Sequence, residues 1–336
     1  MLHYPVTAAT SGAGRRRIIV QTAVRELEGF SQAKALAARQ QTSSLYGLVL
    51  GRIGALEVRL ARGDAEIAAA QEVRYRVFYE ELGAGNGAPG NAERHDADRF
   101  DALCDHLLVF DTALPGPEHR RIVGTYRLLT EERAAAAGGF YSDGEFELKK
   151  LIARHPGQRF VELGRSCVLP DYRSKRTIEL LWQGIWAYIK HHDIGVMAGC
   201  ASFHGTVPAA HAEALSFLAH NCRARGAYDV RAVPERYCSM DLMPIEAITA
   251  KSAIARLPPL IKAYLRVGAR IGDGCVIDRE FGTVDVFVVM PVREIDQRYV
   301  SYFGGEPIVS PREASRSLNS RRPWHAIAKI RQRNPR

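Results

Sequence analysis

The chain of 336 residues is 46% hydrophobic and 25% charged, which is typical of a globular protein with one large core or two modest ones. Its net charge of +9 comes from its ends, since residues 312–336 hold eight basic residues against one acidic residue and residues 1–45 hold six against two. The body between them is slightly acidic and has no nucleic-acid-binding motif, so the composition excludes a nucleic-acid partner and favours an anionic membrane surface or an acidic protein partner for the basic ends.

The first half of the chain predicts helices and strands in close succession. Residues 20–42 are rich in Ala, Gln, Glu and Arg and predict a helix. A second helix is expected over residues 65–83, with Asp64 as its N-cap, and a polar, glycine-rich loop follows it. The strands predicted in this half are residues 56–63, 106–111 and 121–130.

The second half predicts two buried strands, residues 160–168 and 194–203, with a helix over residues 176–190 between them. After about residue 245, a helical stretch interrupted by Pro-Pro leads to the segments CVID and TVDVFVVMP, which are expected to pair as a hairpin. This alternation predicts a three-layer α/β fold with a central mixed, mostly antiparallel sheet and a C-terminal extension.

Four parts are predicted along the chain. They are a basic, partly helical N-terminal arm (1–48), a core domain (49–245), a helix-and-hairpin extension that packs on the core (246–310) and a basic tail (311–336). In the tail, PWHAIAKIRQR has apolar residues at helical spacing, which suits a short helix at a membrane interface. A solvated tail without a partner is the alternative.

The segment FVELGRSCV, residues 160–168, carries Glu162 and Arg165 inside a predicted strand. Side chains of a regular strand alternate between faces, so these two would point in opposite directions. One extra residue would bring them to the same side, and Gly164 is of the type that marks such a β-bulge. We therefore expect a bulge here and a strand that lines a reaction cleft.

Further charged residues lie in neighbouring predicted elements. Arg74 and Phe78 are four residues apart on one helix face, and Arg127 lies on the strand 121–130. The loop before that strand has Asp96, Asp98 and Asp101. A buried salt-bridge network without catalysis explains these residues as well as a catalytic site does.

In chain order these motifs read RYRVF, D-x-D-x-F-D, GTYRLL and VELGRSCV. The series resembles the acyl-homoserine-lactone synthases, members of the acetyltransferase superfamily that take acyl groups from acyl carrier protein. The tryptophan that those synthases carry shortly after the Phe is absent, because EELGAG occupies this region. Lactone synthesis is therefore not the activity that this resemblance favours.

A closer resemblance is to the L-ornithine N-alpha-acyltransferases of bacterial ornithine-lipid biosynthesis. The likeness covers about residues 50–305 and includes FELKKLI, GCASFHG, LPPLIKAYLRVGARIGDG and FGTVDVFVVMP. It implies an acetyltransferase-like fold. It also implies transfer of a 3-hydroxyacyl group from acyl carrier protein to the α-amine of L-ornithine, giving lyso-ornithine lipid. No permanently bound cofactor is expected, and the phosphopantetheine thioester of acyl carrier protein is the implied co-substrate.

Aminolysis of a thioester needs a neutral amine, and Glu162 is the predicted general base that accepts the amine proton. Arg165 is expected to orient Glu162 or to pair with Asp98 or Asp101, and backbone N–H groups freed at Gly164 are expected to polarise the thioester carbonyl. For the substrate, Arg74 or Arg127 is expected to pair with the ornithine carboxylate, and Asp98 or Asp101 with its side-chain ammonium. Phe78 completes the substrate-binding set.

Acetyltransferases that use coenzyme A have R-x-x-G-x-G after this strand, but the chain reads RSKRTI there. Without the glycines, Arg173, Lys175 and Arg176 are predicted to meet the phosphopantetheine phosphate and the acidic carrier protein, a solvated helix start being the alternative. Cys167 and Val168 complete the predicted donor-binding residues. No motif places a His–Asp pair beside Cys167, so direct attack without an acyl-enzyme is expected.

Six cysteines without CxxC or metal-like spacing predict reduced thiols and no metal site. The chain has no run of about 18 apolar residues and no secretory signal, so a cytoplasmic protein, peripheral at most on the inner face of the membrane, is predicted. Two alternatives to ornithine acylation stay open. One is an acyltransferase of the same fold that uses lysine, glutamine, glycine or a lactone-forming amine, and the other is a non-catalytic, membrane-associated binding protein.

Overall fold

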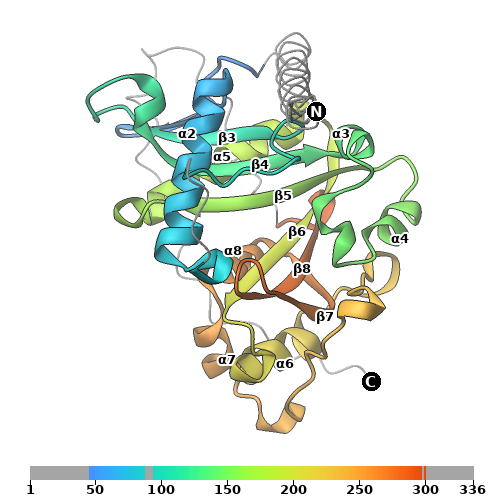
Figure 1. Cartoon of the computed structure of the whole chain (residues 1–336). Coiled ribbons are helices and arrows are strands. Elements are labelled where there is room, and N and C mark those ends of the chain that lie inside the picture. The colour runs from blue at the N-terminus through green and yellow to red at the C-terminus, as the bar shows by residue number, and fades with distance from the viewer. Residues whose placement is uncertain (1–44, 88–93, 297–298, 300–336) are drawn as a thin grey trace, which may run out of the picture.

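The computed structural model describes residues 45–87, 94–296 and 299, so the predicted helix 20–42, most of the N-terminal arm and the basic tail lie outside the described residues. One eight-stranded sheet runs through the described chain in the order β1-β2-β3-β4-β5-β6-β8-β7 (Figure 1). Among the strands of this described sheet, only β5 and β6 pair in parallel, and every other neighbouring pair is antiparallel. The predicted mixed, mostly antiparallel sheet is confirmed.

The strands are β1 (Gly51–Ile53), β2 (Leu56–Leu60), β3 (Asp105–Asp111), β4 (Ile122–Thr130), β5 (Arg159–Val168), β6 (Ile194–His204), β7 (Arg270–Asp278) and β8 (Thr283–Pro291).

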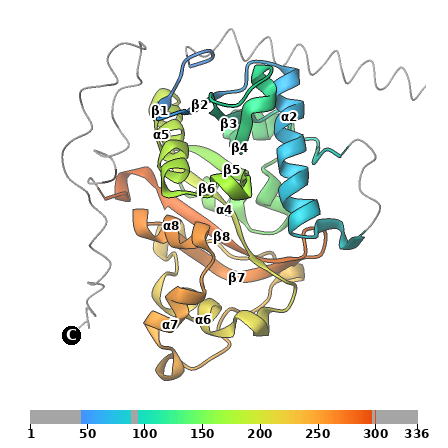
Figure 2. The same cartoon turned by 90° about the vertical axis from the view of Figure 1, so that its left-hand side faces the viewer.

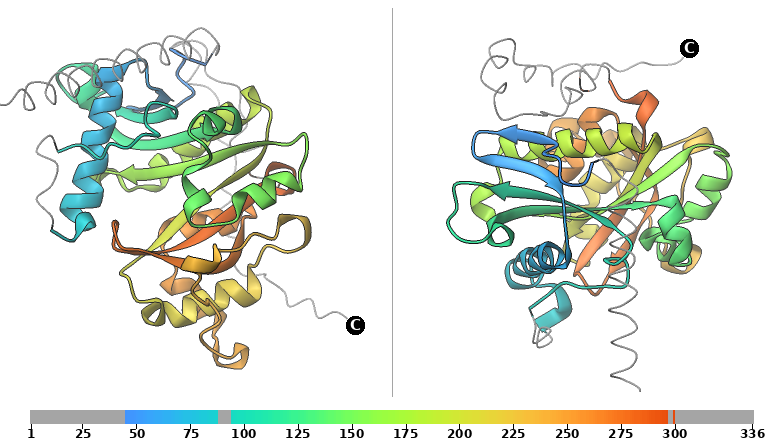
Figure 3. Two further views of the ribbon diagram at one scale, coloured as in Figure 1. Left: turned by 45° about the vertical axis from the view of Figure 1, so that its right-hand side comes forward. Right: turned by 90° about the horizontal axis from the view of Figure 1, so that it is seen from above.

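The helices cover both faces of this sheet, which confirms the three predicted layers (Figures 2 and 3). In β3, alternate side chains point to opposite faces of the sheet and so pack against helices of different layers. Leu107 and Val109 pack in the core beneath α5, whereas Leu108 and Phe110 pack against α2. The described α-helices are α2 (Asp64–Tyr75), α3 (Glu131–Ala136), α4 (Leu148–Ala153), α5 (Lys175–His191), α6 (Ala212–Asn221), α7 (Ala250–Arg256) and α8 (Pro259–Val267).

Two helices show how local sequence sets their bounds. The helix predicted over 65–83 is α2 followed by a π-helical segment, Arg76–Glu81, and its N-cap is Gly63 and not the predicted Asp64. Asp64 instead lies in the first turn, where a carboxylate favours the helix dipole. The helix predicted over 176–190 is α5, and the side chain of its N-cap, Ser174, accepts a hydrogen bond from the Thr177 amide.

Strands β5 and β6 pair only from Arg159 and Ile194 to Glu162 and Ala198, although both strands continue well beyond these residues. Figure 1 shows β6 leaving β5 at a wide angle. At the point of divergence, Gly199 has a φ of +155°, and a Cβ atom there would lie 2.3 Å from the Leu163 carbonyl oxygen. Glycine at this position therefore lets the backbones of β5 and β6 approach closely at the residue where the two strands begin to separate.

The predicted hairpin near the C-terminus is β7 and β8, but β8 inserts between β6 and β7 and pairs with β6 from Val196 to His204. These strands thus complete the central sheet. The boundaries predicted at residues 48, 245 and 310 stay predictions. No helix in the described part of the chain is both long enough and apolar enough to cross a bilayer.

Candidate active site

A cavity of about 270 Å³ lies where β5 and β6 diverge. Its wall combines residues from β4, β5 and β6 with residues from the β7–β8 hairpin and from α8. The apolar part includes Leu163, Leu260 and Tyr264, whereas the polar part includes Ser142, Glu162 and Asp285. The cavity therefore offers an apolar surface beside ionisable groups, a combination typical of small-molecule binding sites.

Glu162 lies on β5 in the cavity wall and is 5% exposed. Its carboxylate accepts hydrogen bonds from the backbone N–H groups of Tyr141 (2.7 Å) and Ser142 (2.9 Å) and from the Ser142 hydroxyl. Burial raises the pKa of Glu162 above its ordinary value, and these hydrogen bonds oppose the shift in part. A carboxylate with a raised pKa is a stronger base than an ordinary one.

The predicted β-bulge is present. Gly164 pairs with Arg127 and Cys167 pairs with Thr125, so Arg165 and Ser166 together face Tyr126. The residue with left-handed backbone is Arg165, at φ +48°, and not Gly164. Gly164 thus predicted the correct segment for the β-bulge, but the extra residue of the bulge follows the glycine. The bulge directs the Arg165 guanidinium over the rings of Phe281 (4.2 Å) and Tyr141 (4.8 Å).

The arginines and aspartates singled out in the sequence form one buried ion network. Arg74 binds Asp96 and Asp101 at 2.8 Å each. Arg127 binds Asp98 at 2.6 Å and Asp101 at 3.3 Å. Arg165 reaches Asp96 and Asp98 at 3.3 and 3.4 Å. Burial alone would raise the pKa of Asp101, but Arg74 and Arg127 outweigh burial and hold it well below its ordinary value.

The structure separates the predicted catalytic and substrate-binding residues into two groups. Those that line the cavity are Phe78, Arg127, Glu162, Gly164 and Arg165. Arg74, Asp98 and Asp101 are joined to the wall through Arg127 and Arg165.

The predicted donor-binding residues lie further along the chain, from the end of β5 to the start of α5. Arg173 binds Glu81 at 2.6 Å, while Lys175 and Arg176 are exposed. Val168 is partly buried, and Cys167 is buried in the apolar cluster beneath α2. Burial raises the pKa of the Cys167 thiol to about 12, so it is a poor candidate for a nucleophile. The roles assigned to these residues stay predictions.

A group that sequence reasoning missed lies on the hairpin side of the cavity. Asp285 lies on β8 and is 6% exposed, and burial together with the neighbouring Glu145 raises its pKa to about 7. One atom each of Glu145, Cys200 and Asp285 lie within 4.8 Å of one another, so this group has donors that could hold a metal ion. Sequence reasoning could have found Asp285, because it is a carboxylate within the otherwise apolar segment TVDVFVVMP. Glu162 was singled out for the same reason, as a charged residue inside a predicted strand.

The matching family model is described as an acetyltransferase (GNAT) domain and covers residues 73–183. The chain is 62% identical over 280 residues to an L-ornithine N(alpha)-acyltransferase of Brucella abortus, covering 83% of this chain and 98% of that protein. Proteins of the same name match from Agrobacterium fabrum (55% identical, covering 81% and 92%) and Rhizobium meliloti (57%, covering 77% and 87%). The acetyltransferase-like fold implied by the sequence motifs is thereby confirmed. Identity of this degree over most of each relative shows that the chain is an enzyme, an N-acyltransferase, and belongs to the family of L-ornithine N(alpha)-acyltransferases.

Proposed function

We propose that the protein transfers a 3-hydroxyacyl group from acyl carrier protein to the α-amine of L-ornithine and so forms lyso-ornithine lipid. The observation that supports this most is Glu162, a buried carboxylate of raised pKa in the wall of an open cavity. The acceptor is taken from the printed names of relatives that are up to 62% identical to this chain.

In the proposed step, Glu162 removes a proton from the α-ammonium group, directly or through a water molecule. The neutral nitrogen attacks the thioester carbonyl carbon and forms the new C–N bond. The nitrogen then loses a second proton, the C–S bond breaks, and the departing thiolate of the donor takes up this second proton. The first proton leaves Glu162 to solvent before the next cycle. No covalent bond to the enzyme is needed, which agrees with the raised pKa of the buried Cys167 thiol.

The bulge at Arg165 and Ser166 supplies the second element of the mechanism. Two residues face one on the neighbouring strand, so at least one backbone N–H group at this position lacks its regular ladder partner. We assign this donor to the thioester oxygen, where it stabilises the negative charge of the tetrahedral intermediate. Removing one such donor typically costs about 3 kcal/mol of transition-state stabilisation.

The acceptor carboxylate is assigned to the arginine side of the cavity. Of the two arginines predicted for this role, Arg127 contributes to the wall, whereas Arg74 is fully buried behind it. Arg165 also lines the cavity and lies beside Arg127 in the ion network. A carboxylate that enters from the cavity would share these guanidinium groups with the buried aspartates.

The donor is assigned to the surface at the start of α5. Arg176 is exposed there, beside Arg173, which pairs with Glu81, and Lys175, which pairs with Glu179. An acidic carrier protein would compete with these glutamates for the basic side chains. Contact of the basic tail with an anionic membrane remains a prediction from the sequence, because the tail lies outside the described residues.

The experiment combines the purified protein with a 3-hydroxyacyl thioester of acyl carrier protein and L-ornithine, and product is measured by mass spectrometry. We expect 3-hydroxyacylornithine together with one free phosphopantetheine thiol per product. The same acyl group on coenzyme A tests the donor, and lysine, glutamine and glycine test the acceptor. Product from coenzyme A alone would overturn the donor assignment, and acylation of another amine in place of ornithine would overturn the acceptor.

A further inference from the structure

The cavity carries excess negative charge. In the ion network, three arginines balance three aspartates. Glu145 is balanced by Arg236, at 3.1 Å. Among the described wall residues, the carboxylates Glu162, Asp278 and Asp285 form no ion pair, although the charge of Arg127 acts on Glu162. An acceptor with two ammonium groups and one carboxylate brings the complementary charge.

Asp285 is the least compensated of these carboxylates. It lies within the sheet, opposite Ser202 on β6 and Val276 on β7, and is 6% exposed. Its carboxylate accepts hydrogen bonds from the Thr283 hydroxyl, at 2.8 Å, and from the Ser202 side chain, and no Lys, Arg or His of the described chain forms an ion pair with it. A buried carboxylate without a cation is unfavourable, so its surroundings favour any cation that can reach it.

Asp278 differs from Asp285 because its carboxylate stabilises a turn. Its Oδ1 accepts hydrogen bonds from the backbone N–H groups of Glu280 (2.8 Å) and Phe281 (3.0 Å) and so closes the turn between β7 and β8. Asp285 closes no turn and faces the cavity.

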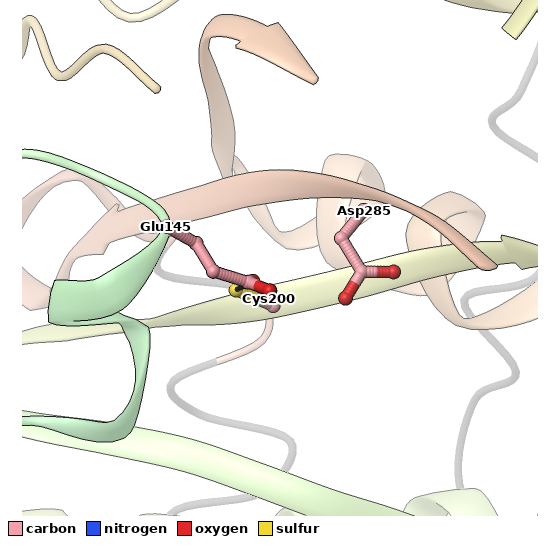
Figure 4. Close-up of side chains that lie close together, drawn as sticks. All are labelled: Glu145, Cys200 and Asp285. Carbon is pink, nitrogen blue, oxygen red and sulfur yellow. Dashed lines mark hydrogen bonds between the residues drawn. The ribbon is translucent and has the colours of Figure 1, made fainter. Parts of the chain in front are cut away.

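The groups around Asp285 increase its need for a cation. Figure 4 shows Glu145, Cys200 and Asp285 converging from separate elements. Burial raises the pKa of the Cys200 thiol well above its ordinary value, so the thiol stays protonated and donates to Glu145 at 3.3 Å. The cluster thus brings Asp285 a second carboxylate and a neutral thiol, and no positive charge of its own besides the Arg236 that Glu145 already binds.

Asp285 and Glu162 are connected along one side of the cavity. The Ser142 hydroxyl binds the Glu162 carboxylate and lies 3.2 Å from the Cys200 sulfur, and Cys200 belongs to the cluster that contains Asp285. A substrate with two amino groups at the ends of a short carbon chain can therefore place one group at Glu162 and the other at Asp285.

We propose that Asp285 binds the side-chain ammonium group of the acceptor while Glu162 takes the proton of its α-amine. This inference rests on the proposed function and names the part of the site that selects a diamino acid. Pairing with Asp285 keeps the side-chain amine protonated and unreactive, so acylation is directed to the α-nitrogen. Asp98 and Asp101 are not needed for this role, since both already bind arginine.

The test compares L-ornithine with L-2-aminopentanoate, which has the same carbon skeleton and α-amine but lacks the side-chain amine. In Asp285→Asn, we expect kcat/KM for ornithine to fall about a hundredfold and kcat/KM for 2-aminopentanoate to change only severalfold, because the variant removes one partner of a buried charge pair. Equal losses for both acceptors would overturn the inference and leave the proposed function standing. If the wild-type protein acylates no amine from either donor, the proposed function fails and the inference fails with it.

Asp285→Glu provides an independent readout. It keeps the charge but moves the carboxylate further into the cavity, so we expect the preference to shift from ornithine toward the shorter 2,4-diaminobutanoate. An unchanged order of acceptors in this variant would contradict the inference even where Asp285→Asn fails to fold. Asp241→Asn is the matched control, since Asp241 is exposed and pairs with His220 at the surface. It should leave both kcat/KM values unchanged.

Discussion

Glu162 and Asp101 are both buried carboxylates, yet their surroundings move their pKa values in opposite directions. Asp101 binds two arginines, and its pKa is held well below the ordinary value. Glu162 is bound by neutral donors, so burial dominates and its pKa is raised. The first environment suits a structural anion and the second suits a group that exchanges protons.

Replacing Glu162 by Gln should lower kcat by about 10²- to 10⁴-fold, because the base is lost while the hydrogen-bonded shape of the site is retained. In the wild-type protein, Glu162 must be deprotonated to act, so activity should fall as pH drops through its raised pKa. This limb of the pH profile should vanish in the variant. Glu72→Gln, on the exposed face of α2, should keep both the rate and the profile. A variant at Glu162 with wild-type kcat would remove it from the mechanism.

Replacing Arg74 by Ala should destabilise the fold by about 3–5 kcal/mol, because Asp96 and Asp101 would stay buried with less compensation. Asp101 has a lowered pKa in the folded protein, so its contribution to the free energy of unfolding is present above the ordinary pKa of aspartate and is lost as pH falls. Because the variant lacks part of this contribution, it should unfold at a higher pH on acidification. Urea denaturation and acid titration measure the two effects. Arg52→Ala, which breaks a more exposed ion pair with Glu57, should cost about 1 kcal/mol or less. A loss at Arg74 no larger than at Arg52 would argue against a structural network.

At the scale of elements, the site depends on two irregularities in neighbouring strands. The bulge in β5 turns Arg165 to the side of Glu162, and the close approach at Gly199 lets β6 separate from β5 without a break in either strand. A regular pair of strands would fill this space with ladder hydrogen bonds and leave no cavity. The cavity therefore exists because two strands stop pairing at a defined residue.

Gly199→Ala should lower the free energy of unfolding by about 2 kcal/mol or more, since the new methyl group would collide with the Leu163 carbonyl and φ at this position disfavours side chains. Activity should fall in the folded fraction as well, because relief of the collision moves β5. Gly144→Ala is the matched control, as an added Cβ there meets no atom within 4 Å. Equal stability of the two variants in urea would show that the close approach is not tight.

At the scale of the whole molecule, the C-terminal hairpin is part of the central sheet and of the cavity. Strand β8 pairs with β6 along nearly its whole length and contributes Asp285, and α8 contributes Tyr264. The Tyr264 hydroxyl meets that of Tyr126 from β4, so the segment after residue 245 contacts the core through α8 as well as through β8.

A chain that ends at residue 245 should fail to form a cooperative fold, because β6 would lose its antiparallel partner and the apolar face of the sheet would be exposed. A chain that ends at residue 299 keeps every described element and should fold. Circular dichroism and thermal unfolding of the two truncations measure the difference. A cooperative transition in the shorter chain would show that the extension packs on an independent core.

The sequence by itself determined the order and type of most of the longer elements, the strand that carries Glu162 and Arg165, and the arginines and aspartates of the ion network. Local periodicity and spacing carry this information, and the motifs in chain order indicated the family. The sequence did not indicate the short elements β1, α3 and α4. Only the tertiary structure decided that Asp98 and Asp101 bind arginines, that Arg165 and not Gly164 adopts the left-handed backbone, and that Asp285 reaches the same cavity as Glu162. Glu162 and Asp285 are far apart in the chain, and no local pattern specifies that β8 inserts beside β6, because strand order depends on how the apolar faces of all the elements pack together.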